Sequence, residues 1–123
     1  MLLAALASVV IASCYDGDTC TTTNGERVRL ACIDTPEMKA STRLRPTSTK
    51  SATYDNTSAI ESRDYPRQLV AGKRVSIRRI TTDRYGRTIA ELLMDDINVG
   101  QEMVEIGHAE LYRKYTKQCA WSR

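Results

Sequence analysis

The chain has 123 residues, which suits one domain with a single modest core. Its formal net charge is +3, which permits a polyanionic partner without requiring one. Phe is absent and Trp occurs once, so the core is expected to consist mostly of Val, Ile, Leu and Ala. No cysteine spacing resembles a CxxC zinc site, and the single histidine, His108, disfavours histidine-based catalysis.

The first twelve residues form an uncharged apolar run that is too short to span a bilayer. The run resembles the apolar part of a secretory signal, with Ala5-Leu6-Ala7 as a cleavage site, although a basic segment before it is missing. Residues 8–15 are better explained as an apolar core strand. We therefore predict a truncated signal peptide over 1–7, one domain over 8–123, and a secreted or periplasmic protein.

The first third of the chain predicts a three-stranded meander. Residues 8–15 are rich in Val and Ile, and residues 19–23 are β-branched. Asn24-Gly25 is a strong signal for a type I′ hairpin turn, which needs positive φ at both positions. Residues 26–33 then alternate in polarity and predict the third strand.

The remaining elements complete a barrel pattern. Residues 38–58 are polar and predict an exposed loop, and Pro66 should end or kink a helix predicted over 58–70. Two further strands and a last helix are predicted over 74–80, 88–94 and 99–107. We therefore predict a mainly β OB-fold: a five-stranded Greek-key barrel with two to three helices and α+β character.

The four cysteines are compatible with two disulfides in an exported protein. Side chains alternate between the two faces of a sheet, and with tight turns in the meander Cys20 would lie on the opposite face from Cys14 and Cys32. This argues against a Cys20–Cys32 bond. We expect a Cys14–Cys119 bond that fastens the C-terminal tail to the first strand. Buried free thiols are an alternative of equal weight.

Four acids gather near two predicted strand ends. Asp16 and Asp18 lie in the first turn, and Asp34 and Glu37 follow the third strand. In a meander these positions are neighbours, and close carboxylates repel one another unless a cation or a proton intervenes. Oxygen ligands suit Ca²⁺ or Mg²⁺. The plainer alternative is that Asp16 and Asp18 only shape a turn.

Arginine and tyrosine add the chemistry of a phosphate site. Arg29 and Arg87 lie near the predicted cation site, and guanidinium groups match phosphate oxygens, although a solvated charge is the usual role of a single arginine. Tyr85, Tyr112 and Tyr115 could stack on bases or pack in the fold. A basic flank for a nucleic-acid backbone comprises Lys73, Arg74, Arg78, Arg79, Arg84 and Arg87.

Together these motifs resemble the staphylococcal nuclease (thermonuclease) family over roughly residues 9–115. The resemblance rests on the order and spacing of Asp16-Gly17-Asp18-Thr19, of Val28-Arg29-Leu30 leading to Ile33-Asp34-Thr35-Pro36-Glu37, of Asp83-Arg84-Tyr85-Gly86-Arg87 and of Gly107-His108-Ala109. Members of that family are OB-fold, Ca²⁺-dependent phosphodiesterases that cleave DNA and RNA. The resemblance thus implies Ca²⁺ as cofactor and nucleic acids as substrates.

The resemblance also assigns metal-binding roles. It implies that Asp18 and Asp34 ligate Ca²⁺, with the Thr35 carbonyl as a further ligand and Asp16 in the outer shell. Glu37 would orient or deprotonate the attacking water.

The same comparison assigns the substrate contacts. Arg29 and Arg87 would bind the phosphate and stabilise its transition state, so the expected catalytic residues are Arg29, Glu37 and Arg87. Arg84 and Tyr85 match positions near a terminal phosphate of the nucleotide, and Tyr112 and Tyr115 are expected to bind substrate.

The chain departs from the family in its long polar segment 38–58, in Pro66, and in ending soon after Trp121. An OB-fold nucleic-acid-binding module without catalysis therefore remains an alternative, as does a shortened chain that folds poorly. We expect a monomer without stable membrane association.

Overall fold

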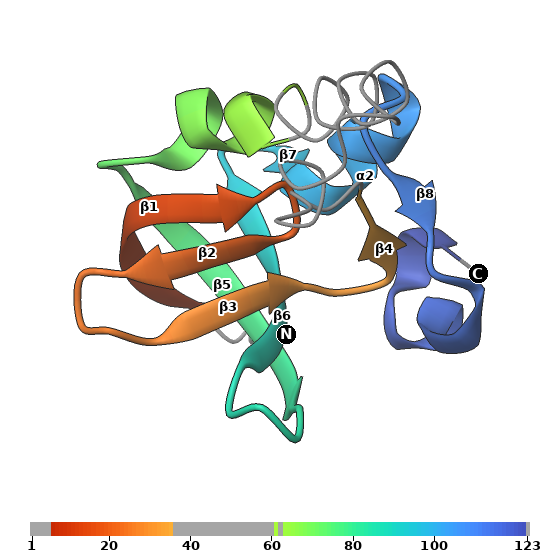
Figure 1. Ribbon diagram of the computed structural model, residues 1–123, viewed down its shortest axis with the longest axis horizontal. Coiled ribbons are helices and arrows are strands. Elements are labelled where there is room, and N and C mark those ends of the chain that lie inside the picture. The colour runs from red at the N-terminus through yellow and green to blue at the C-terminus, as the bar shows by residue number, and fades with distance from the viewer. Residues whose placement is uncertain (1–5, 36–60, 62, 123) are drawn as a thin grey trace, which may run out of the picture.

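The computed structural model describes residues 6–35, 61 and 63–122, and its main feature is a six-stranded sheet (Figure 1). The strands follow the spatial order β3 (Arg27–Leu30), β2 (Thr19–Thr22), β1 (Ala7–Asp16), β5 (Arg74–Thr82), β6 (Thr88–Met94) and β7 (Ile97–Asn98). A parallel pairing of β3 with β6 closes five of them into a barrel. The predicted OB-fold is confirmed.

Helices and short strands lie around this barrel. One helix covers residues 61 and 63–70, and α2 (Val99–Glu105) lies beside it at the top of Figure 1. The strand β4 (Ile33–Asp34) pairs with β8 (Glu110–Leu111), and the 3₁₀ helices η3 (Arg113–Gln118) and η4 (Ala120–Ser122) end the described chain. Among the described helices, none is long and apolar enough to cross a membrane.

The barrel interior is filled by aliphatic side chains, as the composition predicts. Every second residue of β3 points inward, so Val28 and Leu30 are buried whereas Arg29 reaches the surface. The helix α2 adds Val99 and Met103, and burial of each such side chain contributes about 1.5–3 kcal/mol. The largest buried aliphatic side chains are Ile11, Leu30, Ile33, Ile77, Leu92 and Met103.

The hairpin between β2 and β3 forms where predicted, but the type I′ turn is wrong. The Thr22 amide donates to the Glu26 carbonyl, and the Gly25 amide donates to Thr22, so residues 23–25 form a three-residue loop. Gly25 has φ +87°, whereas Asn24 is not among the described residues with positive φ. This loop is one residue longer than a two-residue turn, and it pairs Cys20 with Val28.

That one-residue change reverses the predicted facing of Cys20 relative to β3, and a register shift between Cys14 and Asp16 brings Cys20 opposite Cys14. The disulfide prediction is corrected accordingly. Cys20 faces the core with Cys14, its partner across β1 and β2, and the two are bonded. The second bond joins Cys32 to Cys119. The C-terminal tail is therefore fastened by a disulfide, as predicted, but to Cys32 rather than to Cys14.

The third strand is shorter than the predicted 26–33. It ends at Leu30, and Cys32 adopts φ +71° at a corner before β4 begins. This left-handed conformation is uncommon for a residue other than glycine and lies outside the β region. The strand therefore ends before Cys32. The corner moves Asp34 out of the barrel strand and onto β4.

Two predictions concern the connection between β4 and β5. The loop predicted over 38–58 lies outside the described residues, as does the start of the helix predicted over 58–70. The helix does not end at Pro66, because the described part continues to Val70. Pro66 is almost completely buried, and this packing offsets the hydrogen bond that a proline removes.

Candidate functional site

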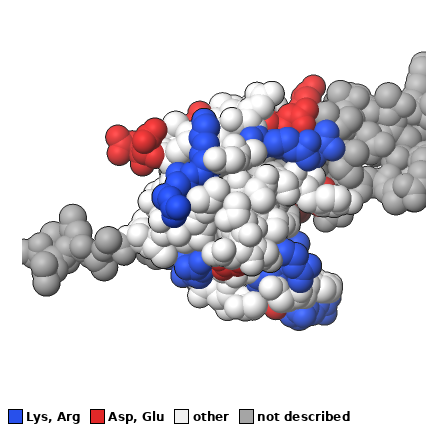
Figure 2. Space-filling model, turned by 90° about the vertical axis from the view of Figure 1, so that its left-hand side faces the viewer, with Lys and Arg blue, Asp and Glu red and all other residues white. Residues whose placement is uncertain are grey.

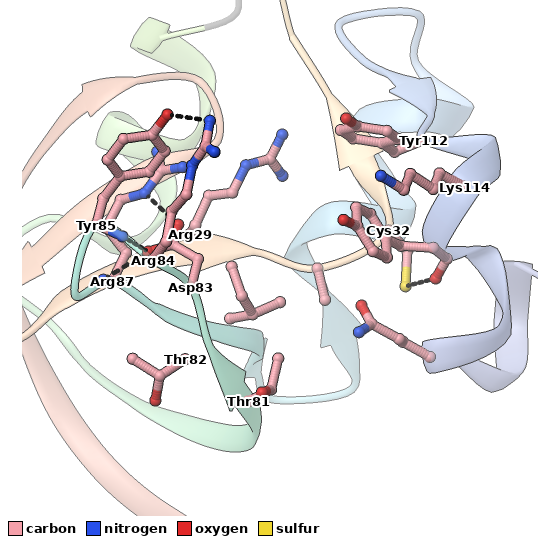
Figure 3. Close-up of a pocket in the computed structure, with 14 residues that line it drawn as sticks. Arg29, Cys32, Thr81, Thr82, Asp83, Arg84, Tyr85, Arg87, Tyr112 and Lys114 are labelled. Carbon is pink, nitrogen blue, oxygen red and sulfur yellow. Dashed lines mark hydrogen bonds and ion pairs between the residues drawn. The ribbon is translucent and has the colours of Figure 1, made fainter.

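A cleft of about 610 Å³ separates the tip of the β5–β6 hairpin from the C-terminal 3₁₀ segment (Figure 3). Arg29 projects from β3 between these two walls. The lining comprises Arg29, Ala31, Cys32, Thr81, Thr82, Asp83, Arg84, Tyr85, Arg87, Ile89, Tyr112, Lys114, Tyr115 and Gln118. All the arginines and tyrosines predicted as catalytic or substrate-binding residues line this one cleft: Arg29, Arg84, Tyr85, Arg87, Tyr112 and Tyr115.

The cleft suits a negatively charged ligand with aromatic groups. Its lining holds four basic residues and one acidic residue. Tyr85 is 58% exposed, and Tyr112 and Tyr115 are 37% and 41% exposed, so all three tyrosines reach the solvent. Basic groups attract phosphates, and exposed tyrosine rings offer stacking surfaces for bases.

Arg29 occupies the centre of a small polar network. Its Nη1 donates to the carbonyls of Leu30 and Ile33, both at 2.7 Å, and so spans the corner after β3. Its Nη2 lies 3.2 Å from Asp18 Oδ2 and 3.4 Å from Asp34 Oδ1. The guanidinium is therefore fixed by β3 and β4 while it lines the cleft.

The two carboxylates that meet at Arg29 fit a hard cation. Asp18 is 5% exposed and accepts a hydrogen bond from the Thr19 hydroxyl at 3.0 Å, whereas Asp34 is exposed on β4. Both approach one guanidinium nitrogen, Arg29 Nη2. Carboxylate oxygens are ligands that Ca²⁺ prefers, and the donor chemistry therefore fits Ca²⁺.

The other residues predicted for the metal site are Thr35, Asp16 and Glu37. Thr35 is 6% exposed, and its hydroxyl has no hydrogen-bond partner among the described residues. Asp16 ends β1 opposite Thr19. Glu37 lies outside the described residues. Within the described ranges no group of three acids, histidines or cysteines is placed to bind a metal, so a cation here would also need carbonyl, water or substrate oxygens.

The tip of the hairpin orients Arg87. Asp83 Oδ2 accepts from Arg87 Nε at 2.7 Å, and Asp83 Oδ1 accepts from the Tyr85 and Arg87 amides, both at 2.9 Å. Burial raises the pKa of Asp83, but these hydrogen bonds outweigh it and hold the pKa below its ordinary value. The Arg84 and Arg87 guanidinium groups lie 5.0 and 5.6 Å from the Tyr85 ring centroid.

Sequence reasoning missed two residues of this cleft. Asp83 was part of a turn motif but had no assigned role, and it anchors Arg87. Lys114 lies 5.4 Å from the ring of Tyr115 and adds a fourth positive charge. Its position between Tyr112 and Tyr115 in the chain is the signal that could have identified it.

The predicted basic flank is not continuous. Arg78 Nε donates to Glu91 at 2.5 Å, and Arg79 makes two hydrogen bonds with Glu26, which hold the pKa of Glu26 below its ordinary value. On the face opposite the C-terminal segment, basic side chains form separate groups with uncharged surface between them (Figure 2). Arg78 and Arg79 are thus paired with acidic side chains, whereas Arg84 and Arg87 line the cleft.

These observations define the class of domain: a small OB-fold barrel with a basic, tyrosine-lined cleft. The family described as Staphylococcal nuclease homologue matches residues 27–121. Two curated proteins named "Uncharacterized endonuclease", from Escherichia coli and from Escherichia coli O157:H7, are each 35% identical over 104 residues. Those matches cover 81% of this chain and 58% of the relatives. The chain belongs to the staphylococcal nuclease family.

A plant relative is more distant. A "Probable staphylococcal-like nuclease" from Oryza sativa subsp. japonica is 27% identical over 117 residues. The match covers 95% of this chain and 26% of that protein. The chain thus spans little more than half of the bacterial relatives and about a quarter of the plant relative.

Proposed function

We propose that this domain is a Ca²⁺-dependent nuclease of the thermonuclease type, which hydrolyses phosphodiester bonds of DNA and RNA with low sequence specificity. The observation that carries the proposal is the position of Arg29. It lines a basic, tyrosine-lined cleft and also contacts the two carboxylates suited to a cation. Family membership and the names of the relatives, which are described as endonucleases or nucleases, support the same activity.

The arginines supply charge where the reaction develops it. Phosphodiester cleavage increases negative charge on the non-bridging oxygens, and donors fixed in advance stabilise that charge. Arg29 is fixed by two backbone carbonyls and Arg87 by Asp83, so neither group needs to reorganise during the reaction. Glu37 is proposed to orient or deprotonate the attacking water.

Asp18 and Asp34 are the proposed Ca²⁺ ligands, with the Thr35 carbonyl as a further ligand and Asp16 in the outer shell. When bound, Ca²⁺ would supply charge stabilisation at the phosphate and bring the water close to it. Asp18 is prepared for this role because the Thr19 hydroxyl and the backbone bond from Leu30 N to Asp18 O fix its position.

Low sequence specificity follows from the type of contact that the cleft offers. Guanidinium groups bind phosphates, which carry no sequence information, and tyrosine rings stack on any base. Tyr85, Arg84, Tyr112 and Tyr115 are the proposed substrate-binding residues. They come from both walls, so a single strand would pass between the hairpin tip and η3.

We also propose an exported, monomeric protein. Its four cysteines form two disulfides, and disulfides persist mainly in oxidising compartments. The prediction of a signal peptide over 1–7 concerns residues that mostly lie outside the described part of the chain, and β1 begins at Ala7.

Digestion of plasmid and single-stranded DNA in Ca²⁺ and in EGTA tests the proposal. Wild type should cleave in Ca²⁺ and not in EGTA. Arg87→Ala should lower kcat by about 10²–10³-fold, the usual effect of losing one electrostatic donor, and Glu37→Ala by about 10²–10⁴-fold, the usual effect of losing a general base. Arg74→Ala is the matched control, because Arg74 bonds Ser8 and does not line the cleft. A folded wild type that binds DNA but cleaves nothing in Ca²⁺ would establish the non-catalytic binding module instead.

A further inference from the structure

The wall of the cleft that carries Tyr112, Lys114 and Tyr115 has little packing of its own. The helix η3 is a short 3₁₀ segment in which no residue is buried. It follows β8, a strand of two residues. Segments with few buried contacts open locally at low cost, so the position of this wall depends on what fastens its ends.

The first fastening is the corner after β3. Cys119 follows η3 directly and is bonded to Cys32, 87 residues earlier in the chain. The Tyr112 amide donates to the Cys32 carbonyl at 2.8 Å, and the Cys32 sulfur lies 3.4 Å from the Tyr115 carbonyl oxygen. Both cysteines are almost fully buried, so the bond joins the wall to the floor of the cleft.

The second fastening is Glu91, which is 8% exposed. Its Oε1 accepts from Trp121 Nε1 at 2.9 Å, and its Oε2 accepts from Arg78 Nε at 2.5 Å. Arg78 also donates to the Gln118 carbonyl at 2.9 Å. These bonds hold the residues on both sides of Cys119 against the barrel, so reduction of the disulfide alone need not unfold η4.

Cys32 also belongs to the corner that Arg29 spans. Arg29 donates to the carbonyls of Leu30 and Ile33, one on each side of the residues that turn the chain. The disulfide approaches the same corner from the C-terminal side. One covalent bond therefore connects the segment bearing Tyr112 and Tyr115 with the segment bearing Arg29 and Asp34.

We propose that Cys32–Cys119 is a positioning pair for nucleic-acid binding: the bond holds the tyrosine wall across the cleft from the hairpin tip. This inference rests on the proposed function. In the reduced protein only hydrogen bonds hold the ends of the wall, so Tyr112 and Tyr115 are less firmly positioned and stack less well on single-stranded DNA. Phosphate contacts from Arg29, Arg84 and Arg87 remain, so affinity falls while chemistry on bound substrate continues.

The two disulfides provide a matched pair of variants. Cys32→Ala/Cys119→Ala removes the bond at the cleft, whereas Cys14→Ala/Cys20→Ala removes a buried bond that does not line it. We expect the first variant to bind single-stranded DNA about tenfold more weakly in EGTA, the size of losing one stacked base, with kcat in Ca²⁺ changed by less than about threefold. The second should bind like wild type.

Reduction offers the same comparison within one protein. In Cys14→Ala/Cys20→Ala only Cys32–Cys119 can react. A dithiol reductant transfers two electrons and two protons to it, giving two thiols and one cyclic disulfide of the reductant. The affinity for DNA should fall about tenfold on reduction and recover on reoxidation. This arm remains informative even if Cys32→Ala/Cys119→Ala fails to fold.

Two readouts do not depend on nucleic acid. Trypsin should cleave faster after Arg113, Lys114 and Lys117 in the reduced protein, and the fluorescence of Trp121, the only tryptophan, reports whether η4 stays packed. Faster cleavage with unchanged DNA affinity would overturn the positioning role, as would equal losses of affinity in both disulfide variants. An oxidised wild type that neither binds nor cleaves DNA would instead contradict the proposed function.

Discussion

Arg29 shows how one side chain connects the structure to the proposed chemistry. It lies on the outward face of β3, between the buried Val28 and Leu30. Its contacts with two carbonyls and two carboxylates require the planar, multi-donor shape of a guanidinium group, which an ammonium group lacks. The alternation of β3 predicts where Arg29 points, but only the corner at Cys32 brings Asp34 to it.

Arg29→Lys should therefore lower both the stability and the activity of the protein, although it preserves the charge. A lysine cannot donate to Leu30 and Ile33 while it also faces Asp18, and the buried Asp18 carboxylate loses its guanidinium partner. We expect the free energy of unfolding to fall by about 1–3 kcal/mol and kcat to fall by about 10²-fold. Urea unfolding and initial cleavage rates measure the two effects. Arg74→Lys, with an unchanged midpoint, is the control.

A loss of activity without any loss of stability in Arg29→Lys would mean that the carbonyl contacts do not hold the corner. A loss of stability without any loss of activity would remove Arg29 from the proposed phosphate site.

At the scale of elements, the β2–β3 hairpin sets the register of the sheet. Its three-residue loop pairs Cys20 with Val28 and leaves Arg29 opposite Thr19. The loop needs a left-handed residue only at Gly25, where φ is +87° and an added Cβ would meet nothing within 4 Å. The cost of replacing Gly25 is therefore conformational rather than steric.

Substitutions at the two turn residues distinguish the observed loop from a type I′ turn. Gly25→Ala should lower the free energy of unfolding by about 1 kcal/mol, the cost of a left-handed conformation for an L-residue. Asn24→Ala should change it by less than about 0.5 kcal/mol, because Asn24 is exposed and does not require positive φ. Chemical denaturation measures both. Equal losses at the two positions would indicate the type I′ turn.

The β5–β6 hairpin tip should respond to acid. The pKa of Asp83 is below its ordinary value of 3.8, so the carboxylate stabilises the fold above that pH, and the contribution is lost as the pH falls through the lower folded value. Arg87 then loses its partner. NMR titration of the Asp83 carboxyl should give a pKa below 3.8, and Asp83→Asn should remove this transition. A pKa of 3.8 or above would contradict the proposed anchoring of Arg87.

For the whole molecule, the sequence predicts the barrel well because its signals are local. Alternating strands, the hairpin at Gly25 and the helix that ends before Gly107 all follow from neighbouring residues. The predicted helix over 99–107 ends two residues early, at Glu105, and Ile106 is 43% exposed.

What the sequence could not provide depends on long-range contacts. Predicting the disulfide partner of Cys119 requires the exact register of a hairpin and the left-handed corner at Cys32. Neither feature has a local signature in the sequence. The same corner decides that Asp34 meets Arg29 and Asp18. The cleft itself forms only when residues 81–87 and 112–118 are placed on either side of β3.

We propose above that Asp18 and Asp34 hold a Ca²⁺ ion that supports cleavage by Arg29 and Arg87. The most direct measurement is the initial rate of single-stranded DNA cleavage against Ca²⁺ concentration, in wild type and in Asp34→Asn. Asp34 is exposed, so the substitution should leave folding intact. We predict saturable activation by Ca²⁺, with the half-saturating concentration raised about tenfold or more in Asp34→Asn as the ligand charge is lost. Cleavage that persists in EGTA, or identical Ca²⁺ curves for the two proteins, would mean that no Ca²⁺ ion at these two carboxylates supports cleavage.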